Sequence, residues 1–233
     1  FSLFPFESDL LKKHKVNFSY VGHHLAQSLP KDVNKDAIKK NFNISNQKKV
    51  IAILPGSRKS EIKYHGGPLI DFINLYKKDN EDSEIVLALN KSEDMPKIFK
   101  EIKDKIKIVF GETQKVLSMA DVAVVASGTA TLEAAILAKP MVVIYKSNFI
   151  SNFILSNFFL KSKYISLPNI LSQREIVPEL RQNKVTGLEI LSNVKSVFLS
   201  ESKIISQLSS LKDNLSVNDS AKFSKAIKKL ILE

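Results

Sequence analysis

The sequence predicts an α/β fold in which helices cover both faces of a parallel β-sheet. Three observations lead to this prediction. The apolar, β-rich runs Val50–Leu54, Val122–Ala126 and Met141–Tyr145 are too short for helices and indicate strands buried on both faces. A run of good helix formers separates the last two, which is the pattern of a right-handed parallel crossover. Strands and helices also alternate through the middle of the chain, as in other parallel-sheet domains.

The first 48 residues are expected to form a connecting segment between domains. The phrase FPFE (4–7) is expected to open a helix, and Phe18–Val21 to form a short strand that turns at Gly22. The adjacent His23 and His24 would point apart, as neighbours on a strand do. Residues 31–48 are polar and predict a solvated linker helix. Because the chain opens on Phe1 inside an apolar phrase, we expect it to be part of a longer protein.

Residues 49–200 are expected to form one α/β domain that binds a ligand at its sheet. A helix at 147–160 is too short and too polar to span a membrane, so core or interdomain packing is expected, with a membrane-surface helix as the alternative. The expected strands are 50–54, 84–89, 106–110, 122–126, 141–145 and 164–169. The expected helices are 61–76, 93–104, 113–119, 130–138, 147–160 and 174–182.

Residues 201–233 are expected to be C-terminal helices. The pattern is helical from Thr186 to Glu233, with no glycine after Gly187. Between Asn214 and Glu233 the apolar residues recur near a period of 3.6, which predicts one apolar face.

The composition and the missing motifs disfavour several classes of function. The net charge of +11 suits nucleic acid or an anionic membrane, but the lysines are scattered and no nucleic-acid-binding signature occurs, so nucleic acid is not expected as a partner. The absence of Cys suits a reducing cytoplasm. The four histidines lack metal-ligand spacing, so no metal is expected. The lack of P-loop, GxGxxG and GxSxG motifs disfavours NTP hydrolysis, common dinucleotide binding and serine-hydrolase chemistry.

Two turns after predicted strands offer donors for an anion. Gly56, Ser57 and Arg58 follow Val50–Leu54 and combine backbone N–H groups with a guanidinium that suits a diphosphate. Ser127, Gly128 and Thr129 follow Val122–Ala126 and open a helix, whose N-terminus favours negative charge. Both turns fall at the carboxyl ends of strands, where open α/β sheets bind ligands.

Glu133 is the only charged residue between Asp121 and Lys139, on an otherwise apolar helix. A capping box would explain it only if Ser or Thr stood at position 130, which is Ala. A solvated glutamate at the sheet margin remains the structural alternative. A ligand contact is favoured, because unpaired charges are rarely buried, and a sugar hydroxyl pair is the expected partner.

Seven phrases in a fixed order resemble the lipid-A-disaccharide synthases, a family of GT-B glycosyltransferases. The resemblance covers nearly the whole chain, although the last fifty or so residues share only helical character. The phrases are FPFE (4–7), YVGH (20–23), ILPGSR with the following EI (53–62), ASGTATLEAAI (126–136), KPMVVIY (139–145), YISLPNIL (164–171) and RExxPELxQ (174–182).

The resemblance implies the C-terminal half of a GT-B fold, in which residues 49–200 are a Rossmann-like, UDP-sugar-binding domain. It also implies that the helices of 201–233 cross to an N-terminal domain or to a partner chain. It implies an inverting, metal-independent transfer of 2,3-diacylglucosamine from UDP to 2,3-diacylglucosamine 1-phosphate. The products would be the β-1,6-linked lipid A disaccharide and UDP. The implied location is the cytoplasmic side of a Gram-negative inner membrane, as a peripheral protein. The acceptor site and the catalytic base are implied to lie in an N-terminal domain outside this chain, so the chain alone is expected to be inactive.

The resemblance also implies roles for individual residues. It places Gly56, Ser57, Arg58, Ser127, Gly128 and Thr129 at the diphosphate, Glu133 at the ribose, and Asn169, Arg174 and Glu175 near the donor sugar or the cleft. Two departures put local loop shape in doubt. Lys63–Pro68 replaces a more apolar ending, and Ser172-Gln173 stands where a small Ala-Gly pair is common.

Two alternatives stay open at the level of sequence. Another GT-B enzyme acting on UDP-N-acetylglucosamine would share the strand and turn pattern, and a non-catalytic nucleotide-binding module would need only half of the cleft. The expected partners are the UDP-sugar donor, a phosphorylated lipid acceptor and the inner-membrane surface, with a homodimer as a further arrangement.

Overall fold

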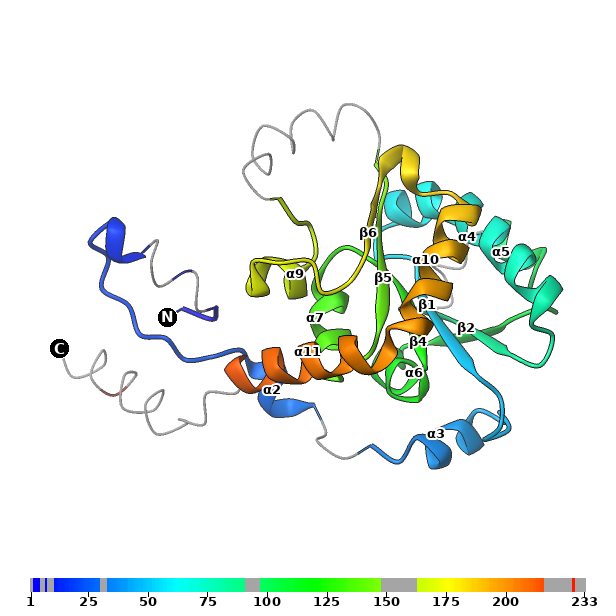
Figure 1. Cartoon of the computed structure of the whole chain (residues 1–233), viewed down its shortest axis with the longest axis horizontal. Coiled ribbons are helices and arrows are strands. Elements are labelled where there is room, and N and C mark those ends of the chain that lie inside the picture. Colours follow the sequence, from blue (N-terminus) through cyan, green and yellow to red (C-terminus); the bar gives the residue numbers. More distant parts are fainter. Residues whose placement is uncertain are drawn as a thin grey trace.

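The computed structural model contains one six-stranded, fully parallel sheet (Figure 1). It describes residues 2–4, 7, 11–29, 33–90, 97–147, 163–215 and 228. The strand order is β3-β2-β1-β4-β5-β6, so the direction in which strands are added reverses between β1 and β4. The strands are β1 (Val50–Leu54), β2 (Glu84–Leu89), β3 (Lys107–Phe110), β4 (Val122–Ala126), β5 (Met141–Tyr145) and β6 (Glu179–Arg181).

The predicted α/β class is therefore confirmed, and five of the predicted strands occur at or within one residue of their expected bounds. All residues of β1 and β4 are buried, as their uninterrupted apolar runs require when helices cover both faces. Their register pairs Ile51 with Val122 and Leu54 with Val125. The two strands consequently end side by side.

Helices connect the strands. The carboxyl end of β1 leads into α4, which covers the sheet with its Leu69, Phe72 and Ile73 fully buried. The chain moves from β1 to β2 and β3 in one direction across the sheet, and from β3 to β4 and β5 in the other. With right-handed crossovers, α4 would lie on one face of the sheet and the helices that lead to β4 and β5 on the other. The helices are α2 (His24–Ser28), α3 (Lys35–Asn41), α4 (Lys59–Asp79), α5 (Lys97–Lys100), α6 (Thr113–Met119), α7 (Thr129–Ile136), α9 (Leu167–Ser172), α10 (Gly187–Leu199) and α11 (Glu201–Leu215), with a 3-10 turn at Gln182–Lys184.

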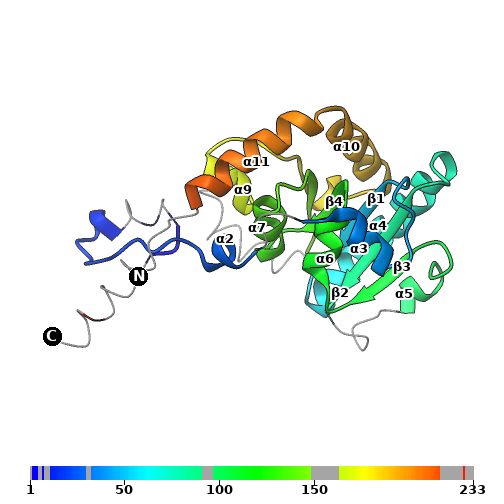
Figure 2. The same ribbon diagram turned by 90° about the horizontal axis from the view of Figure 1, so that it is seen from below.

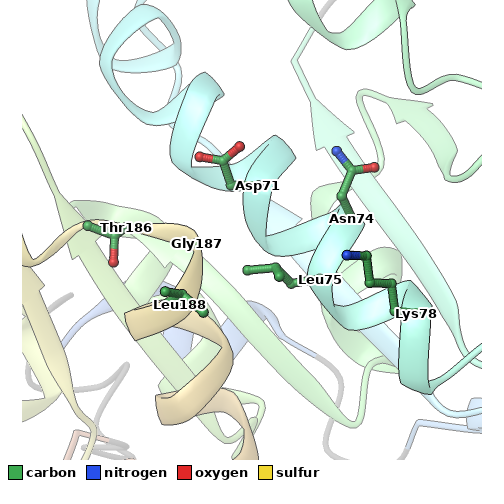
Figure 3. Close-up of a pocket in the computed structure, with 7 residues that line it drawn as sticks. All are labelled: Asp71, Asn74, Leu75, Lys78, Thr186, Gly187 and Leu188. Atoms are coloured by element: carbon green, nitrogen blue, oxygen red, sulfur yellow. The ribbon is translucent and has the colours of Figure 1, made fainter.

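Helix α10 packs directly on α4, and Gly187 at its first turn allows this approach (Figure 3). A Cβ at Gly187 would lie 2.5 Å from Cβ of Asp71 and 2.7 Å from the backbone N of Phe72. The shallow groove beside this contact has a volume of about 410 Å³ and is lined by Asn74, Lys78 and Leu188 among others. No described residue outside α4 and the start of α10 lines it.

The segment that follows β5 differs from the sequence prediction. Residues 164–169 were expected to form a strand, but α9 begins at Leu167 because Pro168 occupies its first turn, where proline is favoured. Residues 174–182 were expected to be helical, but they contain β6, which extends the sheet by pairing Leu180 with Ile144. Tertiary pairing with β5 overrides the local helical pattern here.

The connecting segment also differs in part. Phe18–Val21 forms only a single bridge, between Ser2 and Tyr20, and no strand. His23 caps α2 by accepting a hydrogen bond from the Leu25 N–H, and its ring stacks on that of His24, so the two histidines do not point apart. Lys39 on the predicted solvated helix is buried, because its Nζ donates to the carbonyls of Asn46 and Lys48.

The two ends of the chain bear on the domain boundaries. Residues 11–23 extend away from the sheet (Figures 1 and 2). Helix α11 packs against α7 and α9 of the same domain (Figure 2), with Leu208 and Leu215 buried, so its packing draws no boundary at residue 200. Several expectations fall outside the described residues: most of the FPFE helix, the helix at 147–160, and the course of 216–233 apart from Lys228. The boundaries 1–48, 49–200 and 201–233 stay predictions.

Candidate functional site

A cavity of about 330 Å³ lies at the carboxyl ends of the central strands. Leu54, Ala88 and Ala126, which lie at or next to the ends of β1, β2 and β4, contribute to its wall. This is the point where the strand order reverses, and open α/β sheets bind ligands at such points. Both turns that the sequence singled out line the same cavity. The structure thus brings together Gly56, Ser57, Arg58, Ser127, Gly128, Thr129 and Glu133.

The β1–α4 turn holds one cationic side chain at the cavity. The guanidinium of Arg58 is 80% exposed and pairs with the carboxylate of Glu61, Nη1 to Oε1, at 3.2 Å. Glu61 also lines the cavity, and its Oε2 accepts from the backbone N–H groups of Ser57 and Arg58. Sequence reasoning did not assign a role to Glu61. The available signal was its position three residues after Arg58, at the N3 site of a helix.

The β4–α7 turn presents an uncapped helix N-terminus to the cavity. No side chain caps α7, and the N–H groups of Thr129 and Ala130 have no acceptor within the described part of the chain. Ser127 differs from its neighbours, because its hydroxyl donates to the carbonyl of Ile165 at 2.8 Å and its N–H donates to Ile144. The donors that remain for an anion at this turn are therefore the backbone groups at the start of α7 and the hydroxyl of Thr129, which also lines the cavity.

Glu133 lies one turn further along α7 and is half-buried. Its carboxylate has no hydrogen-bond or ion-pair partner among the described residues, and burial raises the pKa of this carboxyl. It borders the cavity and also a neighbouring hollow of about 450 Å³ formed with Gly111–Lys115. A carboxylate in this state is an acceptor without a donor, which suits a ligand that carries hydroxyl groups.

Two polar side chains that were not singled out from the sequence also line the cavity. Asn90 follows β2 and Thr113 opens α6. Their signal was available, because each is a polar residue directly after or shortly after a predicted strand. No group of three or more His, Cys, Asp or Glu side chains that could hold a metal ion occurs among the described residues.

Comparison with known proteins identifies the family. The sequence profile described as lipid-A-disaccharide synthetase matches residues 1–230. The chain belongs to the lipid-A-disaccharide synthetase family. It is 35% identical over 246 residues to a lipid-A-disaccharide synthase of Cellvibrio japonicus, covering 99% of this chain and 62% of that protein. It is 34% identical over 235 residues to one from Colwellia psychrerythraea, covering 97% and 59%. The chain thus spans about 60% of the length of these two relatives.

Solved structures show the same fold at low sequence identity. The wall teichoic acid polymerase TagF superposes with a TM-score of 0.57 at 16% identity, over 99% of this chain and 56% of that one. The ADP-heptose lps heptosyltransferase II of E. coli superposes with a TM-score of 0.53 at 16% identity, over 76% and 57%. With the parallel sheet, these likenesses confirm the predicted GT-B-like fold for this member of the lipid-A-disaccharide synthetase family.

The structure does not bring the third group of predicted residues to the cavity wall. Asn169 is fully buried, and both the donor and the acceptor of its side-chain amide form hydrogen bonds within the protein. Its Nδ2 donates to Val177 O and to Glu179, and its Oδ1 accepts from the N–H groups of Ile176 and Val177. In this structure Asn169 therefore braces the segment between α9 and β6, and its place near the donor sugar or the cleft stays a prediction.

Arg174 and Glu175 lie on the exposed part of that same segment. The carboxylate of Glu179 accepts from Asn169 and also from the Ile165 N–H, the Ser166 hydroxyl and the Arg181 guanidinium. Burial raises the pKa of this carboxyl, but these hydrogen bonds outweigh that effect, so its pKa is lowered. The placement of Arg174 and Glu175 beside a donor sugar stays a prediction.

Proposed function

We propose that this chain is the donor-binding part of a lipid-A-disaccharide synthase. The cavity between β1, β4 and α7 would hold the UDP of UDP-2,3-diacylglucosamine. The complete enzyme would transfer the acylated sugar to 2,3-diacylglucosamine 1-phosphate with inversion, forming a β-1,6 linkage. Membership of the family and the names of the two relatives support this reaction.

One observation carries the assignment of the cavity to a nucleotide. The half-buried Glu133 carboxylate has no partner among the described residues, and it stands one turn from the uncapped start of α7. A ribose supplies two hydroxyl donors next to an anionic phosphate. That ligand would satisfy the carboxylate and the helix N-terminus together.

The residues of the cavity also suit the chemistry of the donor. Transfer leaves negative charge on the departing diphosphate, and it needs a base to accept the proton of the acceptor 6-hydroxyl. The Arg58 guanidinium and the N–H groups of Thr129 and Ala130 would stabilise that charge without a metal ion. We assign the base to the part of the enzyme that binds the acceptor.

The proposed setting is the cytoplasmic surface of the inner membrane. The net charge of +11 favours a phosphorylated lipid acceptor and an anionic lipid surface. No helix in the described part of the chain has the length and apolar character to cross a bilayer. A peripheral association, with a second copy as a further partner, therefore belongs to the proposal.

Calorimetric titration with UDP in the presence of EDTA tests the proposal. We expect UDP to bind with the chelator present, and Glu133→Ala to weaken it about tenfold or more, since hydrogen bonds to a charged group contribute about 1.5–3 kcal/mol. Glu81→Ala removes a charge from an exposed site outside the cavity and should leave the Kd unchanged. Absence of UDP binding, or its loss on chelation, would contradict the proposal.

Turnover separates the enzyme from a non-catalytic binding module. We expect this chain alone to bind UDP without transferring the sugar, and a protein that also carries the acceptor-binding domain to produce the disaccharide. If that longer protein bound UDP but formed no product, a binding module would be the better description.

A further inference from the structure

The turn after β1 already binds an anionic group, which is the carboxylate of Glu61. Oε2 of Glu61 accepts hydrogen bonds from the N–H groups of Ser57 at 2.9 Å and Arg58 at 3.2 Å. Its Oε1 accepts from Nη1 of Arg58 at 3.2 Å. The backbone donors of this turn are the ones that a diphosphate would otherwise use.

Gly56 shows that the turn is shaped around this carboxylate. Its φ of +115° is strained for any residue with a side chain, and a Cβ there would lie 2.5 Å from Oε2 and 2.7 Å from Cβ of Glu61. Glu61 also stands at the N3 position of α4, where a carboxylate is stabilised by the helix dipole and by the N-cap N–H. Withdrawal of Glu61 would leave two N–H groups and a helix start without partners.

The contact with Arg58 gives the carboxylate a second effect. The Arg58 side chain is 80% exposed, and a free arginine loses rotamer entropy when it is fixed on a ligand. The ion pair with Glu61, whose side chain is 25% exposed, holds one edge of the guanidinium at the cavity before any ligand arrives. The remaining N–H groups of the guanidinium stay available to donate to the oxygens of a diphosphate.

We propose that Glu61 is a positioning residue of the diphosphate site, which stays bound to the turn when the donor binds and holds Arg58 toward the phosphates. This inference rests on the proposed function. It predicts that the diphosphate contacts the Arg58 guanidinium and the start of α7, and that Ser57 and Arg58 do not donate to it through their backbone. The alternative is that the Glu61 carboxylate competes with the diphosphate and is displaced by it. In that case removal of Glu61 would strengthen UDP binding, because it would free two backbone donors and take away a negative charge.

Titrations with UDP and with uridine distinguish a positioning role from competition, because the two predict opposite changes in UDP affinity when Glu61 is replaced. We expect Glu61→Ala to weaken UDP about tenfold and to change uridine less than about twofold, since uridine has no phosphate. Glu61→Gln keeps an oxygen that accepts from the turn, so UDP binding should return to within about threefold of the wild type. Tighter UDP binding by either variant would overturn the proposal, and so would an unchanged Kd in Glu61→Ala.

A double-mutant cycle shows whether Glu61 acts through Arg58. In an Arg58→Ala background, Glu61→Ala should have no further effect on UDP, whereas a general loosening of the fold would add to the loss. Additive losses would contradict a positioning role. If Glu61→Ala does not fold, as judged by urea unfolding, the UDP titration of Glu61→Gln decides the question, because tighter binding than in the wild type would still overturn the proposal.

The outcome for the wild type distinguishes this inference from the proposed function. If the wild-type chain does not bind UDP, the nucleotide assignment itself fails. If it binds UDP and Glu61→Ala binds equally well, only the role of Glu61 fails. Glu81→Ala, with the same change in net charge at an exposed position, controls for long-range electrostatics.

Discussion

The backbone N–H of Lys146 donates a hydrogen bond of 3.0 Å to Nε2 of His65. On the other side of the ring, Nδ1 lies 2.7 Å from the carbonyl oxygen of Pro55. Because a backbone N–H can only donate, Nε2 must be the acceptor, and Nδ1 therefore carries the proton. A buried, neutral histidine thus joins the turn after β1 to the residue that follows β5.

This relationship predicts a pH dependence of stability. Burial lowers the pKa of His65 below its ordinary value of about 6.5, so the unfolded chain takes up a proton first as the pH falls. The unfolding free energy should then decrease with falling pH from about 6.5 down to the folded-state pKa, by at most about 1.4 kcal/mol per pH unit. Above that window the full contribution is present, because the ring is neutral in both states.

Urea unfolding across this window checks the prediction. His65→Gln should remove most of the pH dependence, and His14→Gln, at an exposed position, should leave it unchanged. An equal slope in the wild type and in His65→Gln would show that other groups titrate, of which His23 is one, because burial lowers its pKa as well.

Gly187 should not tolerate a side chain. An added Cβ would meet the backbone of α4 at 2.7 Å, so Gly187→Ala should destabilise the protein by about 1–3 kcal/mol. Leu188→Ala, one residue further along and 68% exposed, should change the unfolding free energy by less than about 0.5 kcal/mol. Thermal unfolding of both variants measures the difference, and an unchanged stability of Gly187→Ala would contradict the α4–α10 packing in Figure 3.

Substitution of Asn169 should lower the stability of the protein, whereas substitution of Arg174 should leave its stability nearly unchanged. Asn169→Ala leaves the N–H groups of Ile176 and Val177 without an acceptor, at about 1–3 kcal/mol for each buried group, and should lower the unfolding free energy markedly. Arg174→Ala, at an exposed position, should change it by less than about 0.5 kcal/mol. If Arg174 reaches the donor sugar, its loss should weaken UDP-2,3-diacylglucosamine more than UDP. Equal effects on both ligands would remove it from the site.

The central sheet could be predicted from the sequence because its strands carry their own signal. Val50–Leu54 and Val122–Ala126 are uninterrupted apolar runs, and only a strand buried on both faces explains them. The position of the cavity followed from those strands, since ligands gather at their carboxyl ends. This is why the turns at Gly56 and Ser127 could be paired although about seventy residues separate them.

The segment 163–184 could not be predicted, because long-range partners decide its conformation. Three residues at Glu179–Arg181 form a strand only because the edge of β5 is available, and no local pattern marks them. The same limit applies inside the site. The sequence offered Ser127 as a phosphate donor, but the structure pairs its hydroxyl with Ile165, which lies 38 residues away. A polar residue at the right turn can still be used by the protein itself.

Arg58 and Glu133 should affect different parts of the same ligand. Each group makes a charge-assisted contact in the proposed complex, so either loss should weaken UDP about tenfold to a hundredfold. Arg58→Ala removes charge from the diphosphate, so uridine binding should stay nearly unchanged. Glu133→Ala removes the acceptor of the ribose hydroxyls, so uridine and UDP should weaken by similar factors. Calorimetric titration of each variant with both ligands gives the four ratios.

The matched control for the cation is Lys59→Ala, which removes the same charge one residue further along at an exposed position outside the cavity. It should leave both ligands within about twofold of the wild type. In the complete enzyme Arg58→Ala should also lower kcat, because charge grows on the leaving diphosphate in the transition state. Equal losses of uridine and UDP in Arg58→Ala, or an effect of Lys59→Ala as large as that of Arg58→Ala, would return Arg58 to the status of a surface residue whose partner is Glu61.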